Sequence, residues 1–185
     1  SAQSSTSDSV EQRVGTVGRV HPHLEIKIVD EQGKVVPRGQ LGELCVRGYS
    51  VMLGYWEDHE KSGEVIDSAR WMHTGDIAEM DEAGFVKIKG RIKDVVIRGG
   101  ENLFPKEIED FLYTHPDVSD VQVIGLPDAR YGEELCACII LHEHHEITEE
   151  SIRQYCAEHI SHNKVPRYVR FFNEFPMTAS GKAQK

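Results

Sequence analysis

Apolar and polar residues alternate along much of the first half of the chain. In residues 24–29 the period of two predicts a strand with one buried face. Similar runs predict strands at 42–47, 77–80 and 85–89, with turns at 30–33 and 81–84. A short helix over 58–66 is expected to interrupt them, with Asp58 as its N-cap. The first half is therefore predicted to be rich in β-structure.

From residue 90 onward, short apolar runs alternate with amphipathic segments. The apolar runs predict strands at 95–97, 118–125, 135–141 and 168–172. Helices are predicted over 105–113 and 149–160, and Pro105 suits the first turn of the former. The second half is thus predicted to be α+β. The change of pattern places a domain boundary near Lys93, between residues 1–92 and 93–185.

Composition narrows the class of protein. Hydrophobic residues make up 39% and charged residues 28% of the chain, as in globular domains. The net charge of -10, with 21 dispersed basic residues, argues against a nucleic-acid partner. No apolar run approaches the roughly 18 residues that a membrane span requires.

The polar segment at residues 1–9 lacks the apolar core and the basic start of a signal or transit peptide, so we expect a flexible loop there. The chain ends at residues 181–185 without a closing element. Together these features favour a fragment of a longer protein.

The four cysteines give no pattern of a metal site. Cys45, Cys136, Cys138 and Cys156 contain no C-x-x-C pair, and Cys136 and Cys138 are expected on one face of a strand. Reduced core cysteines are favoured over a disulfide. The histidine-rich run at 142–145 matches no zinc spacing and is interpreted as a solvated loop. No metal site is predicted.

Thr74-Gly75-Asp76 is the first candidate for ligand binding. Glycine allows a sharp bend, so we expect a turn that leads into a strand at Ile77 and points the carboxylate of Asp76 outward. A carboxylate in this position can accept hydrogen bonds from two neighbouring hydroxyls, as on a ribose. The alternative is that Asp76 caps its own turn.

The second candidate covers residues 90–109, where a charged boundary precedes an apolar strand, two glycines and a proline-started helix. Charged Arg91, Lys93 and Asp94 would keep the boundary solvated and able to turn. Gly99-Gly100 would allow a ligand to approach the backbone closely. An ordinary linker followed by a strand turn is the alternative.

Lys182 is the third candidate, on a loop of small residues after Pro176. A mobile lysine acts as a point charge that suits a phosphate or carboxylate in a transition state. At about 4 Å and an effective dielectric constant of about 20, the attraction is about 4 kcal/mol, enough to affect a rate. A solvated surface lysine is the alternative.

In their order and spacing the three motifs resemble the adenylate-forming, AMP-binding enzymes, from about Val14 to Lys185. The run Gly-Glu-Asn-Leu-Phe-Pro at 100–105 resembles acyl-CoA synthetases more than peptide-synthetase domains, and residues 16–19 and 52–56 resemble medium-chain and fatty acyl-CoA synthetases. The resemblance implies the β-rich end of a large N-terminal domain, part of a distorted β-barrel. A small, mobile α+β C-terminal domain, incomplete at its end, would follow.

The resemblance also implies an ATP-dependent, AMP-forming acid–CoA ligase of fatty acid metabolism. Such an enzyme converts a carboxylic acid, here a fatty acid, with ATP to an acyl-adenylate and passes the acyl group to CoA, and its C-terminal domain rotates about a hinge between the two steps. ATP and Mg²⁺ are bound mainly by residues that precede this chain in the family, so the fragment alone is expected to be inactive.

Its partners would be the small molecules acid, ATP and CoA, in the cytoplasm or, in a eukaryote, the mitochondrial matrix. The alternatives are a non-catalytic CoA- or nucleotide-binding module of the same fold and an adenylating enzyme with another acceptor, a carrier protein or oxygen.

Residue roles follow from the same resemblance. The nucleotide-binding positions are Asp76 and Arg91, the hinge is Lys93 with Asp94, and the catalytic lysine of adenylation is Lys182. The CoA and thioester loop comprises Arg98, Gly99, Gly100, Glu101 and Asn102. Arg98 and Arg130 would either meet the CoA phosphates or pair with neighbouring carboxylates. Ala183 departs from the usual isoleucine or valine after the Gly-Lys pair.

Overall fold

The computed structural model describes residues 2–143, 147–179, 181 and 183. It consists of two compact units, Ser1–Lys93 and Asp94–Lys185. Both contain a β-sheet with short helices, so the predicted α+β class is confirmed. No helix among these residues is long and apolar enough to cross a lipid bilayer.

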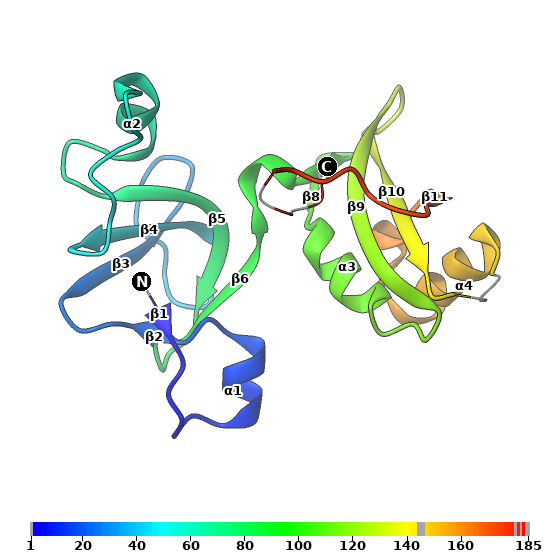
Figure 1. The fold of residues 1–185 in the computed structure, drawn as a ribbon, viewed down its shortest axis with the longest axis horizontal. Coiled ribbons are helices and arrows are strands. Elements are labelled where there is room, and N and C mark those ends of the chain that lie inside the picture. The colour runs from blue at the N-terminus through cyan, green and yellow to red at the C-terminus, as the bar shows by residue number, and fades with distance from the viewer. Residues whose placement is uncertain (1, 144–146, 180, 182, 184–185) are drawn as a thin grey trace. The chain divides into compact units, whose positions relative to one another are not determined.

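The first unit is built on a four-stranded antiparallel sheet (Figure 1). Its strands follow chain order: β3 (Leu24–Val29), β4 (Gly42–Gly48), β5 (Met72–Met80) and β6 (Val86–Arg91). In the described part of the chain β3 and β6 are the edges of an open sheet, which does not close into a barrel.

One face of this sheet carries the hydrophobic core of the first unit. Cross-strand pairs bring apolar residues together there, and the pairs are Ile26–Val46, Ile28–Leu44, Ala78–Ile88 and Met80–Val86. The period of two in the sequence produces this face because alternate side chains of a strand point to the same side. Asp76 continues the row of Met80 and Ala78 on the same strand and lines a cavity with Leu44, Val86 and Ile88.

The first residues are more ordered than the sequence predicts. The strand β1 (Ala2–Gln3) pairs with β2 (Arg19–Val20), and the segment that connects them contains α1 (Val10–Gly15). Ser9 starts α1 with a capping box: the Gln12 amide donates to Ser9 Oγ, and the Ser9 amide donates to Gln12 Oε1. Residues 4–9 lie outside regular helices and strands, as expected of a loop, but the short strand at Ala2–Gln3 was not predicted.

Helix α2 and strand β5 each bear on a prediction from the sequence. The helix α2 (His59–Val65) confirms the prediction at 58–66, and Asp58 caps it by accepting from the Lys61 amide at 2.9 Å. Strand β5 corrects the expected turn before Ile77, because it already begins at Met72 and runs through Thr74-Gly75-Asp76.

The second unit has a mixed five-stranded sheet. Its strands are β7 (Val96–Arg98), β8 (Glu101–Leu103), β9 (Val118–Asp128), β10 (Gly132–Leu141) and β11 (Tyr168–Phe171). Strand β10 is central: it pairs antiparallel with β9 and β7 and parallel with β11, and β8 pairs with β7. The predicted strands are confirmed, but β8 was not predicted.

Two helices cover this sheet. The helix α3 (Pro105–Leu112) packs against β9, and α4 (Glu149–His159) packs against β11. Single 3₁₀ turns, η1 (Ile92–Asp94) and η2 (His162–Lys164), complete the elements. The buried core comprises Val96, Leu103, Ile108, Leu112, Val118, Val121, Val123, Leu135, Ala137, Ile139, Ile152, Cys156 and Val169.

Ile108→Ala should lower the free energy of unfolding of the second unit by about 2–5 kcal/mol, because Ile108 is 1% exposed and its removal leaves a cavity. The matched control is Ile97→Ala in the same unit, where the side chain is 53% exposed and the loss should be below about 0.5 kcal/mol. Amide hydrogen exchange in β9 and β10 measures both. Equal losses would contradict the placement of α3 in the core.

Candidate functional site

The Thr-Gly-Asp motif forms an irregularity inside the sheet. Glu43 pairs with Ile77 and Cys45 with His73, so Leu44 of β4 lies opposite all three motif residues of β5. The chain accommodates the two extra residues because Gly75 has φ +71°, a conformation that glycine adopts without steric cost. The motif is thus a β-bulge that interrupts the β4–β5 pairing.

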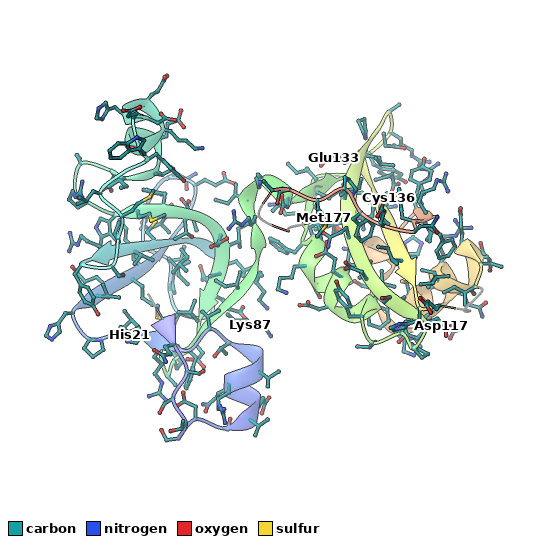
Figure 2. All side chains as sticks on the ribbon, viewed as in Figure 1. His21, Lys87, Asp117, Glu133, Cys136 and Met177 are labelled. Carbon is teal, nitrogen blue, oxygen red and sulfur yellow. The ribbon has the colours of Figure 1, made fainter. Side chains whose placement is uncertain are left out.

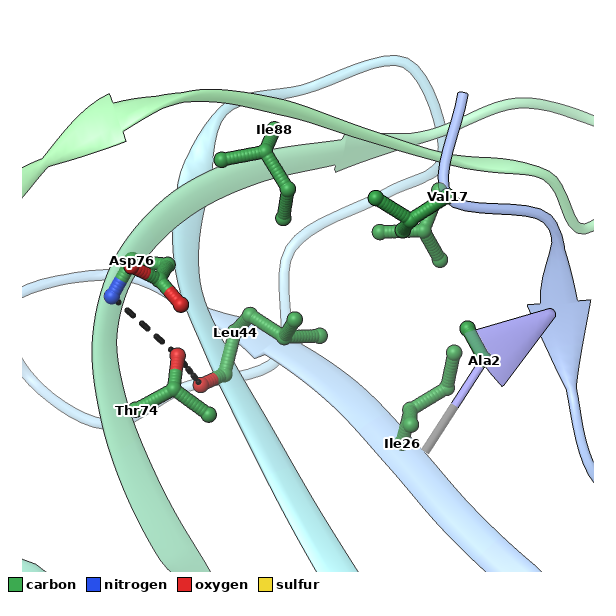
Figure 3. A pocket seen from close by; sticks show the side chains of 8 residues that line it. Ala2, Val17, Ile26, Leu44, Thr74, Asp76 and Ile88 are labelled. Atoms are coloured by element: carbon green, nitrogen blue, oxygen red, sulfur yellow. Dashed lines mark hydrogen bonds between the residues drawn. The ribbon is translucent and has the colours of Figure 1, made fainter. Parts of the chain in front are cut away.

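Thr74, and not Asp76, caps the bulge. The Thr74 hydroxyl donates to the Leu44 carbonyl at 2.8 Å and accepts from the Asp76 amide at 3.1 Å (Figure 3). The carboxylate of Asp76 instead faces Arg91, its direct partner on β6, with 3.1 Å between Arg91 Nε and Asp76 Oδ1. The structure therefore brings together the two residues predicted to bind nucleotide.

This ion pair contributes little to stability. The Arg91 side chain is 55% exposed and that of Asp76 is 26% exposed. Surface pairs of this kind contribute about 0–1 kcal/mol because water screens them and ordering the side chains costs entropy. Arg91 is the last residue of β6 and Asp76 lies in the middle of β5, and both side chains remain partly accessible from solvent.

A cavity of about 210 Å³ lies beside Asp76. Figure 3 shows Thr74 and Asp76 at one end and Ala2 with Val17 at the other. Apolar side chains form most of the remaining wall, namely Ile26, Leu44, Val86 and Ile88. The volume is below the roughly 300–1,000 Å³ of drug-sized sites, so this cavity suits one portion of a larger ligand.

Sequence reasoning missed Glu43, whose side chain supports the bulge. Glu43 Oε1 accepts from the Gly75 amide at 3.1 Å, and Glu43 Oε2 lies 2.7 Å from His73 Nδ1. Cys45 Sγ lies 3.5 Å from the same ring nitrogen. The available signal was a charged residue in an otherwise apolar strand, 42–46.

Glu43, Cys45 and His73 form the set of described residues that could hold a metal ion, with ligand atoms within 4.8 Å of one another. Magnesium, which the family resemblance implies, takes oxygen ligands, so a thiol and an imidazole do not fit it. Burial also raises the pKa of the Cys45 thiol to about 11, with Glu43 adding to the shift. The cluster therefore does not suit magnesium.

The predicted hinge residues lie where the two units meet in the chain. Lys93 and Asp94 belong to the 3₁₀ turn η1, which follows β6 directly. The first unit ends at Lys93 and the second begins at Asp94. Movement about this point remains a prediction.

The predicted CoA loop is a tight β-hairpin. Gly99 and Gly100 join β7 to β8 with φ +60° and +87°, and positive φ at both positions is typical of a type I′ turn. The Gly99 amide donates to the Tyr131 carbonyl at 2.8 Å. Glu101 accepts from Asn163 Nδ2 at 2.7 Å, and Asn102 pairs with Ile97 across the hairpin.

Arg98 anchors the hairpin to a buried carboxylate. Its Nε donates to Glu134 Oε2 at 2.7 Å, and Glu134 is 1% exposed. The guanidinium also lies 5.0 Å from the centroid of the Tyr131 ring. Arg167 approaches the other Glu134 oxygen at 3.4 Å. Of the two alternatives for Arg98, the structure shows the pairing with a carboxylate, and a contact with CoA stays a prediction.

Arg130 lies on the same aromatic ring, 5.0 Å from the Tyr131 centroid. Next to it, the backbone N–H groups of Tyr131 and Arg130 hold the pKa of Asp128 below its ordinary value.

Glu134 was not predicted as a functional residue, because its arginine partners are 33 and 36 residues away in the sequence.

Lys182 lies outside the described residues, as does part of the histidine-rich run. The residues flanking the lysine are described: Met177 and Ala183 form an isolated antiparallel bridge, and the Gly181 amide donates to the Thr178 carbonyl at 2.9 Å.

The four cysteines are free thiols. Cys136 and Cys138 lie on β10, two residues apart, and Figure 2 labels Cys136. A hydrogen bond from Cys136 lowers the pKa of Cys138 to about 7, and the same interaction raises that of Cys136. Burial raises the pKa of Cys156 to about 11.

Comparison with known proteins identifies the family of the chain. A family model described as AMP-binding enzyme matches residues 2–56, and one described as AMP-binding enzyme C-terminal domain matches residues 107–182. The chain belongs to the AMP-binding, adenylate-forming enzymes.

Within that family, the chain is similar to the mitochondrial medium-chain acyl-CoA ligase ACSF2 of Danio rerio, with 54% identity over 179 residues. These cover 96% of this chain and 30% of the relative, so the chain spans about a third or less of that protein.

Two solved structures share the fold. ATP-bound MatB from Rhodopseudomonas palustris has 36% identity and a TM-score of 0.85, over 92% of this chain and 34% of that one. o-Succinylbenzoate CoA synthetase (MenE) from Bacillus subtilis, in complex with its acyl-adenylate intermediate, has 30% identity and a TM-score of 0.86, over 93% and 35%.

Arg98→Leu should lower the free energy of unfolding of the second unit by about 2 kcal/mol, because it leaves the buried Glu134 carboxylate with weaker pairing. Arg130→Leu is the matched control, since this exposed arginine contacts the same Tyr131 ring. Its effect should stay below about 0.5 kcal/mol. Urea unfolding, monitored by amide hydrogen exchange in β7 and β10, measures the free energy of unfolding of both variants. Similar losses in Arg98→Leu and Arg130→Leu would contradict the anchoring role of Arg98.

Cys138 should react first with iodoacetamide, because a pKa of about 7 makes its thiolate abundant at neutral pH. Its labelling rate should rise with pH through about 7. Cys45 and Cys156, which are buried and have pKa values of about 11, should stay unlabelled on the same timescale. Peptide mapping by mass spectrometry measures each site, and Cys138→Ser should remove the fast phase. Faster labelling at Cys45 would contradict the assignment.

Proposed function

We propose that this chain serves an ATP-dependent acid–CoA ligase that forms an acyl-adenylate and then an acyl-CoA thioester. The observation that carries the proposal is the Asp76–Arg91 pair, held at 3.1 Å beside a cavity by a glycine bulge. The names of the relatives support it: one is a medium-chain acyl-CoA ligase, and two neighbours were solved with ATP or an acyl-adenylate.

In the first half-reaction Asp76 accepts hydrogen bonds from the two ribose hydroxyls of ATP. Arg91 fixes the carboxylate and offers further donors on the same side of the sheet edge. A carboxylate oxygen of the acid attacks the α-phosphorus, and pyrophosphate leaves. Lys182 compensates the negative charge that develops on the phosphoryl oxygens, as a positioned point charge can.

In the second half-reaction the CoA thiol attacks the acyl carbonyl, the thiol proton is released and AMP leaves. The hairpin at Gly99-Gly100 lines the path of the pantetheine arm, with Arg98, Glu101 and Asn102 beside it. Positive φ at both glycines supports this role, because bare backbone admits a narrow chain closely. Rotation about Lys93 and Asp94 exchanges Lys182 for this hairpin at the adenylate.

The acid is a medium-chain or other fatty acid, by similarity to the acyl-CoA ligase of Danio rerio. The compartment is the mitochondrial matrix or the cytoplasm, and the relative from Danio rerio is a protein named as mitochondrial. ATP, CoA and the acid are the small-molecule partners.

The roles of Lys182 and Asp76 can be separated in the full-length enzyme. Lys182→Ala should slow ATP–pyrophosphate exchange at least about a hundredfold, while thioester formation from synthetic acyl-adenylate changes less than about threefold. Asp76→Asn should raise the KM for ATP about tenfold or more, because hydrogen bonds to a charged group are lost. Lys34→Ala, at an exposed turn, is the control.

Undiminished exchange in the Lys182→Ala enzyme would refute the role of that lysine. If the parent enzyme catalyses ATP–pyrophosphate exchange with acids of graded chain length but forms no thioester, an acceptor other than CoA is used. Absence of both activities in the parent enzyme would favour a binding module over a ligase.

A further inference from the structure

The bulge is supported from the face of the sheet opposite to the nucleotide-binding side. Asp76 and Leu44 line the cavity on one face. Glu43 and Cys45 flank Leu44 on β4, and because successive side chains of a strand alternate, they lie on the other face. His73, the cross-strand partner of Cys45, lies with them.

One carboxylate fastens this second face. Glu43 Oε1 accepts from the Gly75 amide at 3.1 Å, and Glu43 Oε2 lies 2.7 Å from His73 Nδ1. The Glu43 side chain is 20% exposed and that of His73 is 33% exposed. Hydrogen bonds to a partly desolvated charge are stronger than those between neutral groups, so Glu43 holds residues on both sides of Thr74.

The other face is fastened by Thr74. Its hydroxyl links the Leu44 carbonyl to the Asp76 amide, at 2.8 Å and 3.1 Å (Figure 3). The regular ladder is interrupted between the Glu43–Ile77 and Cys45–His73 pairs, so these side-chain bonds replace it. The backbone direction at Gly75, and with it the aim of the Asp76 carboxylate, depends on them.

We propose that Glu43, with His73, is a positioning residue that sets the aim of the Asp76 carboxylate and so determines selectivity for a ribose over a deoxyribose nucleotide. The inference rests on the proposed function, in which Asp76 binds both ribose hydroxyls. Glu43 acts through its hydrogen bond with the Gly75 amide, on the face of the sheet opposite to the cavity, and does not contact the nucleotide.

The test compares kcat/KM for ATP and for 2′-deoxy-ATP in the adenylation step of the full-length enzyme. The parent should prefer ATP about tenfold or more, and Asp76→Asn should bring the ratio close to one. Glu43→Leu should lower the ratio at least about fivefold and raise the KM for ATP more than it lowers kcat. Glu43→Gln should restore most of the ratio, because its amide oxygen still accepts from Gly75.

The matched control is Glu79→Leu. Glu79 lies on β5, the strand of Asp76, its side chain is 29% exposed, and it pairs with Lys89 at 3.0 Å. The ATP to deoxy-ATP ratio should not change in this variant. If Glu43→Leu fails to fold, Glu43→Asp keeps the charge but is too short to reach Gly75 and His73 together, and it should lower the ratio about threefold.

A double mutant gives the decisive outcome. In the Asp76→Asn background, Glu43→Leu should leave the ratio unchanged, because its effect passes through Asp76. An unchanged ratio in Asp76→Asn alone would refute the role of Asp76 in the proposed function. A collapsed ratio in Asp76→Asn, with the parental ratio kept in Glu43→Leu and Glu43→Asp, would refute only the positioning role. Equal losses with both nucleotides would also refute it.

Discussion

The β4–β5 pairing is the constraint on which the candidate site depends. The pairs Glu43–Ile77 and Cys45–His73 fix two points of β5. Between these points β5 has three residues, 74–76, where β4 has only Leu44. Only a backbone with positive φ at Gly75 satisfies this geometry at low cost. The side chains of Glu43 and Thr74 hold the bulge in place through hydrogen bonds to the backbone.

The bulge also marks the point where the apolar face of the sheet becomes polar. The row Met80, Ala78 and Asp76 changes from apolar to charged where the core ends and the cavity begins. Because the ion pair with Arg91 is largely solvated, it adds little to stability. The pair joins the middle of β5 to the end of β6, beside the cavity.

The sequence predicted elements whose signal is local and missed features that depend on distant partners. Periodicity located the strand at Leu24–Val29, and Asp58 marked the start of α2. The bulge was mistaken for a turn because its shape depends on a register with β4, about thirty residues earlier. The strand β8 has three residues, too few to show a period. The helix α1 was missed because its apolar Val10 and Val14 are 74% and 83% exposed.

The hairpin between β7 and β8 presents bare backbone at Gly100. No heavy atom of the described residues, chain neighbours aside, lies within 4 Å of the point where a Gly100 Cβ would stand. The turn therefore owes its shape to backbone torsion and to the Tyr131 and Glu134 anchors beneath Gly99 and Arg98. A molecule that reaches Gly100 meets peptide groups, whose size and polarity do not depend on the side chains around them.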